Sequence, residues 1–323
     1  MRRTNRNLKS LSDRYTAFCQ AVLPCRAGGE LEHIGDIMRR TPGLAISKVV
    51  QRRVLAAEQI ADGGDDREIA YHHAVFCQTV LPCRRVKDRV WKSTNGLVSL
   101  SIEAGTDLPL PFGPKARLIL TGLDTPAVLH QSALVALGSV TSFIAKMQGR
   151  NPNGAELRKF QEQFAAIAGA QFHLSASQGD DPLRIDGKII TGFEPCYPND
   201  ERQRVRFPSS VRLSDDYFSS LCEHAVPLDP RAIHALENNA LMLDIYKWLA
   251  QCLRRVPREH PAFLVWPNVM ELFDPRYNRL RDFRKAFQKA LKVVLSQYRD
   301  AQVEANVQGV RLCYSRPPIL PKG

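Results

Sequence analysis

The length, composition and charge of the chain predict a globular protein of about two domains. Its 323 residues, 44% of them hydrophobic, can bury a core without disulfides or metals, and they are too apolar for a disordered basic tail. A net charge of +12 indicates a polyanionic partner such as nucleic acid, while the lack of an 18-residue apolar run or of a signal-peptide core after residue 9 predicts a cytoplasmic protein without a membrane segment.

Residues 1–66 are predicted to form an N-terminal helical extension. The decapeptide AFCQAVLPCR at 17–26 recurs as VFCQTVLPCR at 75–84, with eight of ten positions identical. Because stacked repeat folds need three or more units, we interpret this pair as a local duplication. Between the two copies, residues 46–61 have helical periodicity, and the sequence DGGDD at 62–66 ends that helix.

The eight cysteines are spread along the chain in apolar surroundings, which predicts reduced, buried thiols. A zinc site is a weaker alternative, since zinc-binding cysteines are usually two to four residues apart and each close pair here contains a proline. We therefore expect no metal and no cofactor. The zinc alternative would use Cys19 with Cys25, Cys77 with Cys83, and His33, His72 and His73.

Residues 67–225 are predicted to form a first winged-helix domain. Its expected order is a strand, three helices, a tight turn before the third helix, a β-hairpin and a further strand. Pro114 favours a helix start at Gly113. The predicted elements are a strand at 97–103, helices from 113, at 139–147 and at 155–168, a hairpin of 171–175 with 188–193 across 178–182, and a strand at 205–213.

Residues 226–323 repeat this order without sequence identity and predict a second winged-helix domain. A long helix is expected from Asp229 to about Arg255, where Pro257 stops it. The remaining elements are a strand at 263–265, a short helix at 267–273, a helix at 276–298 and a hairpin of 302–306 with 310–314. The predicted fold class is therefore α+β, with two tandem winged-helix domains and an N-terminal helical extension.

The helix at 276–298 is the most strongly amphipathic in the chain. On a helical wheel, Phe283, Phe287, Leu291, Val294 and Tyr298 lie within about 60° of Leu280, at about 100° per residue. Residues 276–292 contain seven Lys or Arg against one acid, Asp282, a net charge of +6. A merely solvated helix usually mixes both signs, so this face favours contact with DNA.

The position of this helix, after a tight turn and before a hairpin, is that of a recognition helix in the major groove. Arg276, Arg279, Arg281 and Lys285 are the candidates for base contacts. The full predicted DNA-binding set is Arg276, Arg279, Arg281, Arg284, Lys285, Gln288, Lys289 and Lys292, with Lys289 and Lys292 assigned to phosphate, and Arg158 and Lys159 in the first domain.

The helix at 155–168 leaves its role open. It carries only Arg158 and Lys159, against Glu156 and Glu162. A second DNA contact and a packing or self-association surface are equally compatible with this balance.

Enzyme motifs are not found in the sequence, and we expect no catalytic activity. His72-His73 has no carboxylate at ligand spacing, and there is neither a Walker-type loop nor a Gly-x-Ser-x-Gly elbow. A nicking enzyme would need a His-hydrophobe-His pair with a tyrosine nucleophile. Tyr217, Tyr246 and Tyr277 are available, but that histidine pair is absent.

Several motifs, in order, resemble the RepA family of plasmid replication initiators. They include FCQTVLPCR, LPFGPKARLIL, HAVPL and ALMLDIYKWLA, and the resemblance extends over about residues 46–318. The segments that carry it are 76–84, 97–105, 110–120, 200–204, 211–214, 224–228, 240–250 and 270–287.

This resemblance implies an initiator that binds directly repeated sites at a plasmid origin, helps to open adjacent AT-rich DNA, and recruits the host initiator and replicative helicase. It also implies a possible homodimer that represses its own promoter. The basic helix from Arg276 to Lys292 would then read the DNA. The residues themselves equally fit a winged-helix transcriptional repressor, and a nicking enzyme is the weakest alternative.

Overall fold

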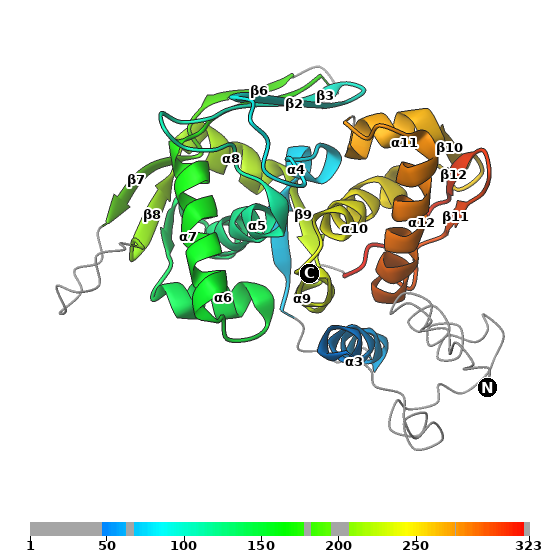
Figure 1. The fold of residues 1–323 in the computed structure, drawn as a ribbon, viewed down its shortest axis with the longest axis horizontal. Helices are drawn as coiled ribbons and strands as arrows, with labels where there is room; N and C mark the ends of the chain where they lie inside the picture. The colour runs from blue at the N-terminus through cyan, green and yellow to red at the C-terminus, as the bar shows by residue number, and fades with distance from the viewer. Residues whose placement is uncertain (1–46, 63–67, 178–181, 195–206, 275, 320–323) are drawn as a thin grey trace, which may run out of the picture.

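The computed structural model describes residues 47–62, 68–177, 182–194, 207–274 and 276–319 (Figure 1). The first copy of the decapeptide, and with it Cys19, Cys25 and His33, lies outside these residues. The helix predicted at 46–61 is confirmed as α3 (Lys48–Asp62), which packs against α9 (Pro230–Leu236) and α12 (Leu280–Gln297). No helix in the described ranges is long and apolar enough to cross a membrane.

The centre of the first half is α5 (Gly113–His130), which begins at Gly113 with Pro114 in its first turn, as predicted, and is buried over most of its length. Beside it lies β1 (Ala70–His73), which is followed by α4 (Ala74–Gln78). The second copy of the repeat begins in α4 and continues beyond it to residue 84. β1 pairs antiparallel with β9 (Ala225–Leu228), a strand that follows α8 (Asp215–His224). The helices predicted at 139–147 and 155–168 are confirmed as α6 (Val140–Gln148) and α7 (Gly154–Gly169).

Two antiparallel sheets complete this half. One has the order β2 (Val90–Asn95), β3 (Val98–Glu103), β5 (Gln171–Ala176) and β6 (Leu183–Gly187). The other has the order β4 (Leu134–Ala136), β8 (Ser210–Leu213) and β7 (Ile190–Glu194).

The predicted hairpin partner of residues 171–175 was wrong. β5 pairs with β6, with Phe172 opposite Gly187, whereas the predicted partner strand is β7 and pairs with β8. Strand β6 was not recognised because Ile185 is its only buried residue. Arg184 and Asp186, on either side of Ile185, form an ion pair on the exposed face. This strand presents too few apolar residues to be recognised from composition alone.

The predicted helix from Asp229 to Arg255 is two helices, α9 and α10 (Ala240–Cys252), followed by a 3₁₀ turn at Leu253–Arg255. The break has two causes. The side chain of Asn239 accepts a hydrogen bond from the Met242 amide at 3.1 Å and starts α10, and Glu237 is fully buried against cations of three other segments.

The remainder of the second half follows the predicted order. It contains β10 (Ala262–Val265), α11 (Trp266–Phe273), α12, β11 (Val303–Ala305) and β12 (Gly309–Leu312), with a three-stranded sheet in the order β10, β12, β11. The order helix, helix, hairpin therefore occurs twice, as α6–α7–β5–β6 and as α11–α12–β11–β12. The predicted α+β class is confirmed, and one continuous hydrophobic cluster runs through both halves.

Candidate nucleic-acid interface

The apolar face of α12 anchors this helix in the second half. Phe283, Phe287, Leu291 and Val294 are each at most 3% exposed. The helix packs on α10, α11 and α3, and the ring of Phe287 meets that of Trp266 at 5.7 Å between centroids. Leu280, which the helical wheel placed on this face, is 37% exposed, because it is the first residue of the helix and lies beyond the packed turns.

The opposite face of α12 is cationic and lies at the surface. Arg281, Lys285, Lys289 and Lys292 are exposed, and Arg284 and Gln288 are half-buried. We call these six residues the cationic face of α12. Within the part of the chain that the structure describes, the four exposed cations form no ion pair with another side chain, and they are available to an external anion.

The predicted helix start at 276 was wrong, because α12 begins at Leu280. Arg276 and Arg279 therefore precede the helix and do not lie on it. The turn at Asp274, whose carboxylate accepts a hydrogen bond from the Arg276 amide at 3.3 Å, delays the helix to Leu280. Both arginines are exposed. The Arg276 guanidinium, however, has an intramolecular partner: it donates to Asp88 at 2.6 Å and lies 5.0 Å from the ring centroid of Trp91.

The hairpin after α12 is held to the cationic face. Arg284 donates from Nη1 to the carbonyl oxygen of Val307 at 3.2 Å, at the turn between β11 and β12. The side chain of Asn306 accepts hydrogen bonds from the Gln308 and Gly309 amides, which closes this turn. Val307 is 77% exposed at the tip. Helix and hairpin tip thus form one surface.

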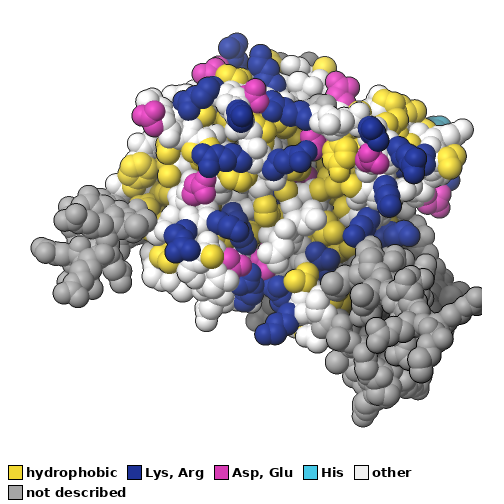
Figure 2. Space-filling model, viewed as in Figure 1, with side chains coloured by type: hydrophobic (Ala, Val, Ile, Leu, Met, Phe, Trp, Pro, Cys, Tyr) yellow, Lys and Arg dark blue, Asp and Glu magenta, His cyan; other side chains and the backbone are white. Residues whose placement is uncertain are grey.

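The corresponding helix of the first half, α7, begins with a capping box. The Asn153 side chain accepts hydrogen bonds from the backbone of the first turn, and the Glu156 side chain accepts one from the Asn153 amide. Phe160 and Phe164 are buried, whereas Arg158 and Lys159 are exposed. α7 and α12 lie on the same face of the molecule in Figure 1, and Figure 2 shows Lys and Arg side chains distributed across that face.

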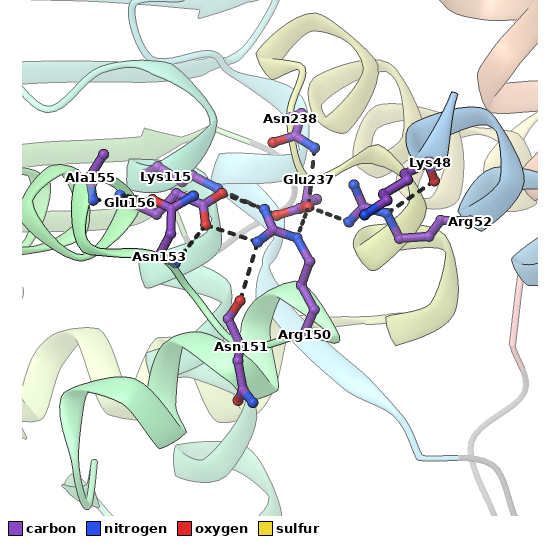
Figure 3. Close-up of polar contacts among 10 residues, drawn as sticks. All are labelled: Lys48, Arg52, Lys115, Arg150, Asn151, Asn153, Ala155, Glu156, Glu237 and Asn238. Atoms are coloured by element: carbon purple, nitrogen blue, oxygen red, sulfur yellow. Dashed lines mark hydrogen bonds and ion pairs between the residues drawn. The ribbon is translucent and has the colours of Figure 1, made fainter. Parts of the chain in front are cut away.

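Glu237 connects the two halves, and no sequence pattern indicated it (Figure 3). Its buried carboxylate accepts hydrogen bonds from Arg52 of α3 at 2.7 Å and from Arg150, in the turn before α7, at 3.0 Å; Lys115 of α5 lies 3.4 Å away. Burial alone would raise the pKa of Glu237, but the Arg52 hydrogen bond and the charges of Lys115 and Arg150 hold this pKa below its ordinary value.

A second buried ion pair joins α5 to α10. Both oxygens of Asp244 accept hydrogen bonds from the Arg117 guanidinium, each at 2.6 Å, and the two side chains are at most 4% exposed. Arg117 also donates to the carbonyls of Leu81 and Pro82 at the end of the repeat. The repeat segment is therefore fixed to both halves.

The histidine pair is buried and cannot meet a substrate. Nδ1 of His72 lies 2.7 Å from the Asp124 carboxylate, which also accepts from the Tyr217 hydroxyl, and His73 contacts Ser220. Burial raises the pKa of the Cys77 thiol to about 12. In the described residues, no group of three or more His, Cys, Asp or Glu side chains could hold a metal ion. We interpret this cluster as part of the core.

The stability of the fold is expected to depend on the protonation of His73. Burial lowers its pKa from 6.5 to about 4, so the unfolded chain binds a proton there between these pH values and the folded chain does not. Unfolding free energy should therefore fall by about 1.4 kcal/mol per pH unit, for this group, as the pH drops from 6.5 towards 4. Urea unfolding between pH 7.5 and 4.5 measures this slope.

The matched variant is His73→Asn, because an asparagine can still accept the hydrogen bond that His73 accepts from the Val75 amide. Relative to the wild type, this variant should lose that part of the pH dependence. Equal slopes in the two proteins would contradict the assignment.

Comparisons with known proteins give the following matches. Residues 110–266 match the family model described as "Plasmid encoded RepA protein". A crystal structure of domains 2 and 3 of RctB, as selenomethionine derivative, is 14% identical with a TM-score of 0.49, covering 74% of this chain and 96% of that one. A second structure of RctB domains 2–3 is 12% identical with a TM-score of 0.46, covering 74% and 94%. No curated protein matches significantly.

Proposed function

Because residues 110–266 match the family model of plasmid encoded RepA proteins, we propose that the chain initiates plasmid replication by binding duplex DNA at the origin. The observation that carries this proposal is the cationic face of α12. Four exposed cations without intramolecular ion pairs in the described residues lie on a helix whose opposite face is buried in the core. Such a face binds phosphates and releases their counterions.

In this proposal both helix–helix–hairpin units are winged helices. α12 enters the major groove, where Arg279, Arg281 and Lys285 contact bases, and Lys289 and Lys292 contact phosphate. Arg276 is a weaker base contact because Asp88 and Trp91 already hold it. The exposed Arg158 and Lys159 support a second contact by α7.

The remaining steps of the proposal follow from the family. The chain would bind repeated origin sites, help to open AT-rich DNA, and recruit the host initiator and helicase in the cytoplasm. It would also repress its own promoter, as a homodimer. The chain has no catalytic role in this proposal, and His72 and His73 belong to the buried core.

Replacement of Arg281 and Lys285 by alanine should weaken binding by roughly 1–3 kcal/mol for each side chain. The reason is that both side chains are exposed, have no ion-pair partner in the described residues and would each lose a contact in the DNA groove. The measurement is fluorescence anisotropy with a 30-base-pair duplex that the full chain has selected from a random library. If about five phosphates are neutralised, the wild-type plot of log K against log salt should have a slope of about −4 to −5.

The matched control is Lys48→Ala/Lys188→Ala, which removes two exposed lysines from α3 and from the turn between β6 and β7. This control should bind the selected duplex like the wild type. Unchanged affinity of the Arg281→Ala/Lys285→Ala protein, with an unchanged melting temperature, would reject α12 as the recognition helix.

Plasmid maintenance separates the initiator from the repressor, since both bind DNA through the same surface. Loss of a dependent plasmid on introducing Arg281→Ala/Lys285→Ala supports the initiator. Retained replication with loss of promoter repression supports the repressor. Cleavage of supercoiled plasmid by the purified protein with Mg²⁺ would favour the nicking enzyme.

A further inference from the structure

A basic loop, residues 84–89 between α4 and β2, is not part of either predicted recognition helix. It contains Arg84, Arg85, Lys87 and Arg89, all exposed, and one acid, Asp88. We call it the basic loop. The first residue of the loop, Arg84, is also the last residue of the repeated decapeptide. The sequence did not explain the function of that decapeptide.

The basic loop contacts α7 and the segment just before α12. The Arg85 guanidinium lies 3.8 Å from the Glu162 carboxylate of α7, and Asp88 accepts the hydrogen bond from Arg276 just before α12. In Figure 1 the chain between α4 and β2 passes between α7 and α11. The loop itself carries four cations and one acid, so its own net charge is positive.

Hydrogen bonds from arginine side chains to carbonyl oxygens hold the loop and the residues before it in place. The Arg89 guanidinium donates three hydrogen bonds to carbonyl oxygens in segment 104–108, at 2.6–3.0 Å. The preceding residues, Leu81 and Pro82, are bound by the buried Arg117. A loop that is already ordered loses little conformational entropy when it binds a partner.

An open surface hollow of about 560 Å³ lies along this loop. Cationic side chains of the loop form part of its wall, and the remaining lining comes from the segment that Arg89 binds. The lining residues are Arg85, Val86, Lys87, Asp88, Arg89, Asp107, Leu108 and Pro109.

We propose that the basic loop binds the sugar–phosphate backbone of the duplex between the parts contacted by α7 and α12. This inference rests on the proposed function and adds a third contact to it. DNA is favoured over an acidic protein because the loop lies between two helices whose exposed cations share one face (Figure 2). A duplex that touches both helices passes over the loop. The Lys and Arg side chains of the loop then contact the phosphates of that duplex.

The test compares Arg84→Ala/Lys87→Ala with the control Lys48→Ala/Lys188→Ala, using the selected duplex and a scrambled duplex of equal composition. These two loop residues form no ion pair in the described part of the chain, so folding should be retained, which circular dichroism checks. Loss of two phosphate contacts should reduce the salt slope by about 1.8 and weaken binding about 30-fold at 0.15 M salt. Both duplexes should lose affinity by the same factor, because phosphate contacts do not read sequence.

The outcomes of the two proposals can be told apart. If the loop variant binds both duplexes like the control while Arg281→Ala/Lys285→Ala loses the selected one, the loop contact is wrong and DNA reading by α12 stands. If the loop variant loses only the selected duplex, the loop reads bases and the phosphate assignment is overturned. If no duplex is selected and neither variant changes binding, the proposed function fails as well.

Discussion

Phe287→Ala is expected to reduce the unfolding free energy by about 3–5 kcal/mol, the usual cost of removing a buried phenylalanine side chain. Phe287 is fully buried, and its ring packs against those of Phe273, Phe283 and Trp266 at 5.2–5.7 Å between centroids. The cavity left by the ring lies directly under the cationic face of α12. Urea unfolding followed by circular dichroism measures the loss.

The control for this prediction is Lys289→Ala, two residues further along the same helix on its exposed face. This variant should keep the unfolding midpoint of the wild type and lose DNA affinity, the reverse of the pattern at Phe287. An unchanged midpoint for Phe287→Ala would show that the apolar face of α12 does not anchor the second half.

Asp244→Ala is expected to cost a similar amount, about 3–5 kcal/mol, since it leaves the buried Arg117 guanidinium without its counter-ion. Arg117 would retain its hydrogen bonds to backbone carbonyls but lose both bonds to carboxylate oxygens. The second half should also be less firmly fixed to the first, because the pair joins α5 to α10. The measurement is again the urea midpoint.

The double variant Arg117→Met/Asp244→Leu removes both charges. It separates the effect of losing the ion pair from the effect of leaving one buried charge without a partner. It should be less destabilised than Asp244→Ala, because no buried charge remains unpaired. If both proteins unfold at the wild-type midpoint, the ion pair does not contribute to the connection between the halves.

Most helices of this fold follow from local sequence signals. The capping residues Asn153 and Glu156 mark the start of α7, Pro114 marks that of α5, and the apolar period of α12 is regular. The break between α9 and α10 has one local signal, the capping residue Asn239. Its other cause could not be predicted in this way, since the cations that bind Glu237 are 87 to 185 positions away in the chain. Strand β6 was missed because it buries a single large residue, Ile185.

The candidate site shows the same division. The cationic face of α12 could be read from the sequence because charge and period are both local. The basic loop could not be identified from the sequence, because only the fold places its four cations near α7 and the start of α12, through contacts with Glu162 and Arg276. The ion pair of Arg276 could not be predicted either, since its partner Asp88 is 188 positions away in the chain.

On the proposed function, the contacts of Glu237 restrict the spacing of the DNA sequences that the chain binds. They tie the turn before α7 to the break before α10, on which α12 packs, so the separation and relative orientation of the two helices are fixed. We therefore expect the proposed binding to tolerate little variation in the spacing of the two contacted sequences. Inserting about five base pairs between them, half a turn of the double helix, would place the second sequence on the opposite side of the duplex.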